Sequence, residues 1–517
     1  MIPILQDSIA LFLPWAWAFI VVPILLLLRY CIYNAYFHPL AKYPGPFLSK
    51  FTMVRQTYHA WKGDVHLDTW RCHQIYGPVI RYGPDKLVFS SPTAMRDIYS
   101  VGSNVTKDPA YAVLGKDRLN LFSLVDKKEH LKRRKQVTSS FSIANIKTFE
   151  RNIQVYVQRF LDALSPHAPG SSWGPAIDVS DWCSFLAFDA MTDFLFGLKY
   201  DLLRDPRWRK VVHDIESTNV RLYVLAHLPW LYLGRMDKWL FPTATRGSRG
   251  FLQFVDQIVK DYPHREESGH IKPFTRLTEA KDESGRPMLN SKQAYSEACM
   301  LVTAAQDTTS ITLRAIMFYL SRYPYAYAKL AQEIRTAFAA DEPISADSKL
   351  KSCVYLNACI MESMRMSPAI TGTAMFRYVS PGGQVVDGEP IPGGCNVATG
   401  IYAVHHNEET FPRPFEFIPE RWMVDEHTSQ VQLDTRIKAW FAFSTGPRAC
   451  IGKAFAQTLI SITIASMVRT YDFRAAEGVE SGRPFGEMGR THPGEFQIQD
   501  YIVSTGEGPV LQMRLRK

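Results

Sequence analysis

The chain has 517 residues, of which 46% are hydrophobic and 21% are charged, and its formal net charge is +9. This is the composition of an ordinary globular protein that can bury a large core, and the moderate positive charge favours anionic lipid or an acidic protein partner over nucleic acid. The eight cysteines contain no C-x-x-C pair, and the closest spacing is Cys353 to Cys359. This argues against a disulfide framework and a zinc site, and it favours a reducing compartment.

The first element predicted along the chain is an apolar helix at residues 9–28. These twenty residues carry no charge, and their length is sufficient to cross the hydrocarbon layer once. The charged residues from Arg29 to Arg55 are basic, whereas only Asp7 precedes the helix, so the positive-inside rule places the rest of the chain in the cytosol. A cleaved signal peptide is the alternative, but its apolar region would be shorter.

A stiff connector is predicted next, because residues 38–46 contain three prolines and one glycine and cannot form a helix. Further on, residues 79–82 and 86–89 alternate in polarity around Gly83-Pro84-Asp85, which predicts a β-hairpin. Residues 149–262 have mostly helical apolar spacing. The sequence therefore predicts a mainly α-helical fold with a small β region.

Residues 126–135 include six lysines and arginines in ten positions. Such a run is typical of nuclear localisation or nucleic-acid binding, but no aromatic residue is interleaved here and no second basic patch exists. His130 and Arg134 are four residues apart and therefore share one face of the predicted helix. A solvated basic face is the alternative to a binding role for these two residues.

Residues 293–322 predict a long helix that ends before Pro324. Its middle reads Ala304-Ala305-Gln306-Asp307-Thr308-Thr309-Ser310. The acidic and hydroxyl side chains of this stretch are poor helix formers, because they compete for backbone hydrogen bonds. Their presence in an otherwise apolar helix suggests a function, and a polar stripe facing solvent is the alternative.

Glu362 and Arg365 lie three residues apart on the next apolar helix. Alone the pair carries little information, because such ion pairs are common on helix surfaces and contribute only tenths of a kcal/mol. Pro419-Glu420-Arg421-Trp422 follows further along and adds a second arginine. We predict a buried Glu–Arg–Arg network that specifies geometry and has no catalytic role. His405 and His406, which lie between the two motifs, are interpreted as structural.

The most informative stretch is residues 443–452, which a helix-forming run follows directly. This places Cys450 at a helix N-terminus, where backbone N–H groups and the helix dipole favour the thiolate and make the sulfur a metal ligand. Gly446 and Gly452 let the backbone turn sharply and approach a flat ligand. Arg448 offers a fork of donors that suits a carboxylate.

The chain ends in a predicted β-hairpin. Residues 495–514 alternate apolar and polar side chains on both sides of Gly506-Glu507-Gly508-Pro509. Alternation around a turn rich in glycine and proline is typical of this element.

The cysteine stretch resembles the cytochrome P450 signature F-x-x-G-x-R-x-C-x-G, which it matches at Phe443, Gly446, Arg448, Cys450 and Gly452. The polar cluster of the long helix resembles the oxygen-activation motif of this family, and the E-x-x-R and P-E-R-W elements fit the same family. The resemblance covers nearly the whole chain. It implies the cytochrome P450 fold preceded by one transmembrane helix, with residues 1–30 as anchor, 31–48 as hinge and 49–517 as one catalytic domain.

The resemblance also implies roles for single residues. Cys450 would be the axial ligand of the iron of haem b, with Phe443 beside the sulfur and with Gly446 and Gly452 shaping the loop. The haem propionates would be bound by Arg134, His130, Arg377 and Arg448. His130 departs from the tryptophan that is usual in the family, and Leu459 from a common glutamate.

In the long helix, the resemblance implies that Asp307 relays protons and that Thr308 holds the water that protonates dioxygen. Ala305 stands where the family usually has glycine. Its extra methyl group is expected to narrow the groove beside the oxygen and to make proton delivery slower or leakier.

The implied reaction inserts one oxygen atom of O2 into a lipophilic small molecule while the other atom leaves as water. Because the chain has no flavin or iron–sulfur motif, electrons would come from NADPH through a separate NADPH-cytochrome P450 reductase, with cytochrome b5 as a further donor. The enzyme would be a single-pass protein of the endoplasmic reticulum membrane with a cytosolic catalytic domain and no nucleic-acid partner.

The sequence most resembles filamentous-fungal enzymes that make secondary metabolites such as mycotoxins, terpenoids, polyketides or alkaloids. Two alternatives remain open at this point: a haem-thiolate isomerase or dehydratase that uses no O2, and a non-enzymatic haem-binding protein tethered to the membrane. The Asp307-Thr308 pair argues against both.

Overall fold

The computed structural model describes residues 19–114, 119–165, 172–265, 269–373, 375–479, 482 and 492–516. Its α-helices after the N-terminal helix are α2 (Val54–Lys62), α3 (Val65–Tyr76), α4 (Pro92–Tyr99), α5 (Lys127–Thr138), α6 (Ile143–Ala163), α7 (Ser180–Phe196), α8 (Lys210–His227), α9 (Met236–Leu240), α10 (Pro242–Asp261), α11 (Pro273–Thr278), α12 (Ser291–Arg322), α13 (Pro324–Ala337), α14 (Ser348–Lys351), α15 (Val354–Met366), α16 (Ile401–His405), α17 (Gln430–Ala439) and α18 (Lys453–Thr470). The strands are short and few by comparison, so the predicted mainly α class is confirmed.

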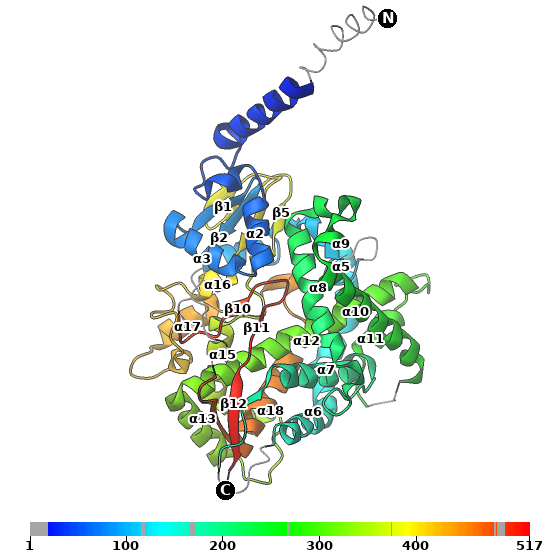
Figure 1. Cartoon of the computed structure of the whole chain (residues 1–517), viewed down its shortest axis with the longest axis vertical. Helices are drawn as coiled ribbons and strands as arrows, with labels where there is room; N and C mark the ends of the chain where they lie inside the picture. The colour runs from blue at the N-terminus through cyan, green and yellow to red at the C-terminus, as the bar shows by residue number, and fades with distance from the viewer. Residues whose placement is uncertain are drawn as a thin grey trace, which may run out of the picture.

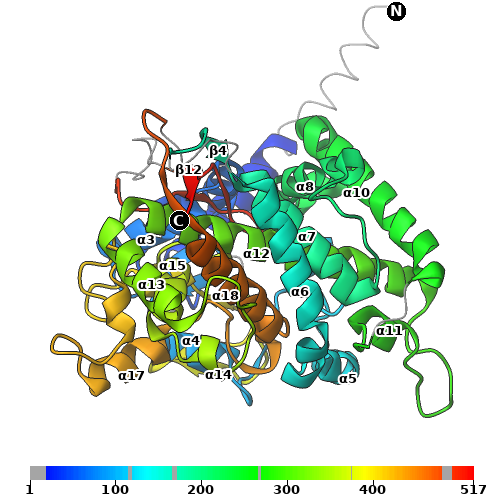
Figure 2. The same ribbon diagram turned by 90° about the horizontal axis from the view of Figure 1, so that it is seen from below.

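Helix α12 runs through the middle of the molecule, and α7, α15 and α18 pack against it (Figures 1 and 2). It begins two residues before the predicted start, because Asn290 and Gln293 form a capping box. It ends at Arg322 as predicted, since Pro324 opens α13. Aromatic side chains such as Phe194 and Phe455, which stack with centroids 4.4 Å apart, fill the core on the α6, α7 and α18 side.

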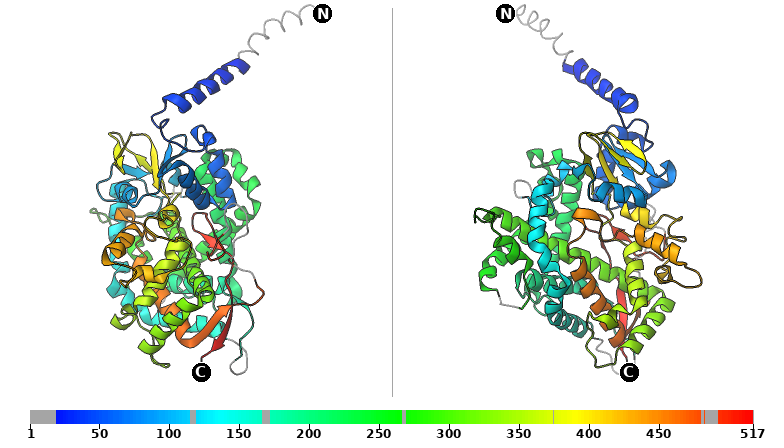
Figure 3. Two further views of the ribbon diagram at one scale, coloured as in Figure 1. Left: turned by 90° about the vertical axis from the view of Figure 1, so that its left-hand side faces the viewer. Right: turned by 180° about the vertical axis from the view of Figure 1, so that it is seen from behind.

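A five-stranded sheet lies at the end of the molecule from which the N-terminal helix projects (Figures 1 and 3). Its order is β1 (Val79–Gly83), β2 (Lys86–Phe89), β8 (Asn396–Thr399), β5 (Arg377–Val379) and β3 (Val105–Lys107). The antiparallel β1–β2 pair confirms the predicted hairpin. The β3–β5 register places Lys107 directly opposite Arg377, so two basic residues lie side by side on neighbouring strands.

The N-terminal helix is apolar and exposed. Its described part, Phe19–Phe37, is long and apolar enough to cross a membrane; residues 9–18 of the predicted span lie outside the described residues. The helix does not end at Arg29 but continues to Phe37 through a π-helical turn. One reason is that Arg81 of the folded domain donates a hydrogen bond of 2.7 Å to the Asn34 carbonyl and so fixes the helix end. After His38 the chain is not α-helical until α2, as the prolines predict.

The predicted terminal hairpin is only partly correct. Strand β10 (Ile498–Gln499) pairs with β11 (Thr505–Gly506), so the turn lies at residues 500–504 and not at 506–509. Strand β12 (Val510–Leu515) pairs instead with β9 (Tyr471–Ala475) and β4 (Ile177–Asp178). The turn moves because Thr371 donates a hydrogen bond of 2.8 Å to Asp500 and holds this residue in the interior, a tertiary contact that alternation does not reveal.

Candidate functional site

The loop before α18 is a tight turn that fixes the backbone of Cys450. The Cys450 N–H donates to the Phe443 carbonyl at 3.0 Å, and the short helix Gly446–Arg448 lies between the two residues. Gly446 has a φ of +72°, and a Cβ at this position would overlap the carbonyl oxygen of Tyr99. Glycine is therefore required here by both conformation and space.

The sulfur of Cys450 lies at the start of α18, as predicted. Among the eight cysteines, Cys450 is the one whose side chain is exposed. Burial by the surrounding atoms nevertheless raises the pKa of the thiol, and the backbone N–H groups of Gly452 and Lys453 oppose this effect. These N–H groups favour a negative sulfur and offset part of the effect of burial.

Four cations and one histidine gather in a buried region next to this loop. Burial lowers the pKa of His130 to about 3, and the positive charges of Arg448, Arg134, Lys107 and Arg377 lower it further. The pKa of Arg448 falls to about 10 for the same reasons, burial first and then Arg377. We call these five residues the cation cluster.

The four lysine and arginine members of the cation cluster bind carbonyl oxygens, and within the described residues the cluster forms no ion pair. Arg134 donates to Ala449 at 2.8 Å, Arg448 to Leu124 at 2.7 Å, and Lys107 to Phe122. Buried charges are normally paired. An uncompensated cluster beside a thiolate therefore fits a cofactor that carries acidic groups, and the two propionates of haem meet this requirement.

Helix α5 supplies two members of the cluster and keeps its other basic residues outside. His130 is 3% exposed, and Arg134 is half-buried. The lysines of the same helix at positions 127, 128, 132 and 135 are exposed. His130 and Arg134 thus lie away from solvent while the lysines form the solvated face, and the binding of propionates by His130 and Arg134 stays a prediction.

The polar cluster of α12 is buried, which excludes the alternative of a solvent-facing stripe. Asp307 is 6% exposed and accepts a hydrogen bond of 2.8 Å from Asn219 of α8. Burial raises the pKa of Asp307 well above its ordinary value. Thr308 donates to the carbonyl of Ala304 at 2.9 Å, and Ala304 is exposed although its helix is mostly buried. One face of α12 therefore opens at Ala304 and Thr308.

The predicted Glu–Arg–Arg network is present and fully buried. Glu362 receives hydrogen bonds from Arg365 at 2.8 and 2.9 Å, from Arg421 at 3.0 Å and from Trp422 at 2.9 Å. Burial opposes the ionisation of Glu362, but the two arginines lower the pKa of its carboxyl group below the ordinary value. The network is a rigid scaffold.

His405 connects this scaffold to the cysteine loop. Its Nε2 accepts a hydrogen bond of 3.0 Å from the Phe441 N–H, and its Nδ1 lies 3.2 Å from the carbonyl oxygen of Arg365. Nδ1 must therefore carry the proton. Burial, together with the charge of Arg365, lowers the pKa of His405 to about 3, so the ring is neutral. The structural interpretation of His405 is confirmed.

Lys107 is the site residue that sequence reasoning missed. It is a single lysine in a three-residue strand and belongs to no motif. Burial and the charges of Arg377 and Arg448 lower its pKa well below the ordinary value. Only the pairing of β3 with β5 reveals its place, so no signal in the sequence could have identified it.

Comparison with known proteins agrees with this site. The family model described as Cytochrome P450 matches residues 39–499. The chain is 40% identical to Cytochrome P450 monooxygenase poxM of Penicillium oxalicum, over 93% of this chain and 91% of that protein. It is 36% identical to Cytochrome P450 monooxygenase atnE of Emericella nidulans, over 94% of both chains. It is also 36% identical to Cytochrome P450 monooxygenase apf7 of Gibberella fujikuroi, over 97% and 98% of the two chains.

Proposed function

This chain belongs to the cytochrome P450 family and is a monooxygenase, and we propose that it oxidises a lipophilic small molecule in the biosynthesis of a fungal secondary metabolite. The observation that carries the haem site is the position of Cys450, an exposed thiol at the start of α18. It lies next to a buried cation cluster that has no carboxylate partner in the part of the chain that the structure describes. The relatives are fungal monooxygenases of the same length, which supports the choice of pathway class.

Some residues of the site hold the cofactor, and others move protons. When bound, haem activates dioxygen with two electrons, so that one oxygen atom enters the substrate and the other leaves as water. Cys450 holds the iron as a thiolate, and the N–H groups of Gly452 and Lys453 stabilise its charge. Phe443 fixes the loop through its carbonyl oxygen, and Gly446 permits the turn.

The cation cluster binds the propionates. Arg134, Arg377 and Arg448 are already held in place by carbonyl oxygens, so little side-chain freedom is lost when the anion arrives. His130 contributes a neutral ring, because the neighbouring cations suppress its protonation. In α12, Asp307 would carry a proton and Thr308 would hold the water that receives it.

Residues 1–30 anchor the protein in the endoplasmic reticulum membrane, residues 31–48 form the hinge, and residues 49–517 form the cytosolic catalytic domain. Exposed apolar side chains of the hinge and of the catalytic domain support this arrangement. Phe47, Leu48 and Trp61 are exposed near the junction with the N-terminal helix, and Trp230 and Trp239 are exposed in the neighbouring segment after α8. Large exposed aromatic residues are typical of a membrane-facing surface.

Electrons come from NADPH through a membrane-bound reductase, with cytochrome b5 as a second donor. The exposed lysines of α5 lie on the helix whose Arg134 contacts Ala449, the residue before Cys450. An acidic donor bound to these lysines is therefore separated from the thiolate by a single helix.

The function is tested by spectroscopy and by metabolite analysis. The purified, haem-supplied protein is reduced and exposed to carbon monoxide, and it should show the red-shifted Soret band of thiolate ligation, which Cys450→Ser should abolish. Strains with and without the gene should differ in a lipophilic metabolite by the mass of one oxygen atom. A folded, haem-loaded protein without the thiolate band would overturn the proposal. Product formation without O2 uptake would favour the isomerase alternative.

A further inference from the structure

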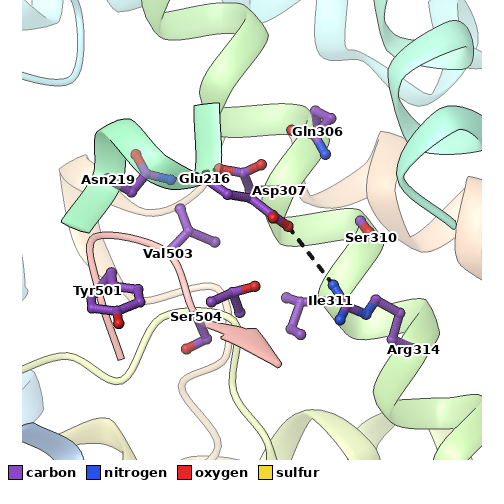
Figure 4. Close-up of a pocket in the computed structure, with 11 residues that line it drawn as sticks. Glu216, Asn219, Gln306, Asp307, Ser310, Ile311, Arg314, Tyr501, Val503 and Ser504 are labelled. Carbon is purple, nitrogen blue, oxygen red and sulfur yellow. Dashed lines mark hydrogen bonds and ion pairs between the residues drawn. The ribbon is translucent and has the colours of Figure 1, made fainter. Parts of the chain in front are cut away.

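A small polar cavity lies beside Asp307, between α8, α12 and the C-terminal segment (Figure 4). Its volume is about 10 Å³, which is room for about one water molecule. Its polar lining comes from three parts of the chain. Helix α8 contributes Glu216 and Asn219; helix α12 contributes Gln306, Asp307, Ser310 and Arg314; and the C-terminal segment contributes Tyr501, Ser504 and Thr505.

Two side chains of this lining have hydrogen-bonding atoms without a partner in the described part of the chain. Gln306 is 0% exposed, and neither its amide oxygen nor its amide nitrogen is bonded. Asp307 uses Oδ2 for Asn219, but its Oδ1 is not bonded. Buried polar atoms nearly always have a partner, and a water with two to four polar neighbours is the ligand that fits a cavity of this size.

The cavity also has a route to solvent through Glu216. The Glu216 side chain is 30% exposed and lies 3.9 Å from Arg314 and 3.9 Å from His213, which is 58% exposed. Arg314 is fixed by the carbonyl oxygens of Gly506 and Gly508, so the inner side of the cavity is rigid. Glu216 is thus the one carboxylate of the lining that reaches solvent.

The charged groups around the cavity act on one another. Burial and then the negative charge of Glu216 raise the pKa of Asp307, whereas the Asn219 hydrogen bond and the charge of Arg314 lower it. The pKa of His213 is raised, first by its hydrogen bond to Glu216 and further by Asp181. Protonation of Glu216 therefore removes a negative charge that raises the pKa of Asp307.

We propose that Glu216 is the outer proton carrier of this enzyme and passes protons through a water in the cavity to Asp307. In this step, which rests on the proposed function, the protonated Glu216 gives its proton to the water, while the water gives one of its own protons to the Asp307 carboxylate. Glu216 then takes a proton from solvent, so the water is restored and both carboxyl groups are protonated; the one proton taken up replaces the one that Asp307 delivered. The path reloads Asp307 after each proton consumed in the reduction of dioxygen.

Glu216→Gln tests the path, because it keeps the side-chain volume and removes the exchangeable proton. The amount of product formed per NADPH should fall on the order of tenfold, below the 10²–10⁴ of a group that acts directly on reacting atoms. The solvent deuterium isotope effect on turnover should rise, because reloading becomes limiting. Glu216→Asp should restore most of the coupling. The matched control is Glu416→Gln, a 54% exposed glutamate paired with Arg413, and it should change nothing.

The substrate-induced spectral shift and the carbon monoxide band separate a proton path from a structural role. Both should be unchanged in Glu216→Gln, whereas a displaced C-terminal segment would alter substrate binding. A readout independent of turnover is the infrared band of the protonated Asp307 carboxyl group, assigned with Asp307→Asn. Its hydrogen–deuterium exchange should slow in Glu216→Gln, and a high-resolution crystal structure should show a water bonded to Asp307 Oδ1.

Three results would overturn the proposal: unchanged coupling and isotope effect in Glu216→Gln, unchanged exchange of the Asp307 band, or a cavity without water. If the enzyme still forms its product in these experiments, only the proton path is refuted. If the thiolate band itself is absent, the proposed function fails instead.

Discussion

Gly446 lies four residues before Cys450 and Gly452 two residues after it, and the two glycines are constrained for different reasons. Gly446 has a left-handed backbone, and its missing Cβ leaves room for the Tyr99 carbonyl. Gly452 has an ordinary φ of −80°, and a Cβ there would meet no atom closer than the Cys450 sulfur at 3.9 Å. Residue by residue, the fold requires Gly446, whereas only a cofactor beside the sulfur requires Gly452.

The two alanine variants should therefore fail in different ways. Gly446→Ala should lower the free energy of unfolding of the apoprotein by at least about 2 kcal/mol, through left-handed strain and the clash. Gly452→Ala should change it by less than about 0.5 kcal/mol but reduce the haem content of the purified protein. Thermal unfolding and the haem-to-protein ratio measure both effects. Equal destabilisation by the two substitutions would contradict this assignment.

Lys107 is the second residue whose contribution we expect to depend on the bound cofactor. In the protein alone it is repelled by Arg377 and Arg448, and a dianion would convert this repulsion into attraction. Lys107→Met should leave the apoprotein within about 1 kcal/mol of its original stability, yet speed haem transfer to an acceptor such as apomyoglobin. Lys86→Met, which removes a lysine of β2 that is paired with Asp108, is the control. A destabilised apoprotein with normal haem retention would show that Lys107 is structural.

At the scale of elements, α5 separates its basic residues into two functions. His130 and Arg134 face the cation cluster, and Arg133 is buried in an ion pair of 3.2 Å with Glu297 of α12. The remaining lysines are exposed. The helix thus links a cofactor-binding face to a charged outer surface within a few turns.

Reversing the outer charges should weaken binding of the reductase without loss of haem. Lys132→Glu combined with Lys135→Glu should raise the Kd of the reductase several-fold, and the effect should shrink as salt increases, because exposed charges are screened. Haem content and the carbon monoxide band should stay unchanged. Lys351→Glu, an exposed lysine of α14, is the control. An unchanged Kd at low salt would exclude this surface.

Element by element, the sequence predicted those features that depend on local pattern or on a strong motif. The extent of α12, the β1–β2 hairpin and the position of Cys450 at a helix start all follow from spacing, capping and turn residues. The partner of β12 and the position of the terminal turn could not be predicted in this way, because they depend on contacts of Asp500 with distant residues. Only strand pairing placed Lys107 in the cation cluster, and only packing revealed that His405 contacts the chain before the cysteine loop.

Across the whole molecule, buried neutral histidines are distributed over several helices. Burial lowers the pKa of His73 and His227 to about 4, and burial with the charge of Arg365 lowers that of His405 to about 3. His227 Nδ1 bonds the Tyr223 carbonyl at 2.9 Å, while its Nε2 has no partner in the described residues. These histidines lie in α3, α8 and α16, so their protonation at low pH affects several parts of the fold.

The fold should therefore lose stability as the pH falls from about 6.5 toward 4. Below 6.5 the unfolded chain binds protons on these histidines and the folded chain does not, so protonation favours unfolding. Each histidine adds roughly 1 kcal/mol per pH unit to this slope. His227→Phe should lower the slope of unfolding free energy against pH by about this amount, whatever its effect at neutral pH, whereas His427→Phe at an 83% exposed position should not. Equal slopes in both variants would mean that His227 is protonated in the folded protein.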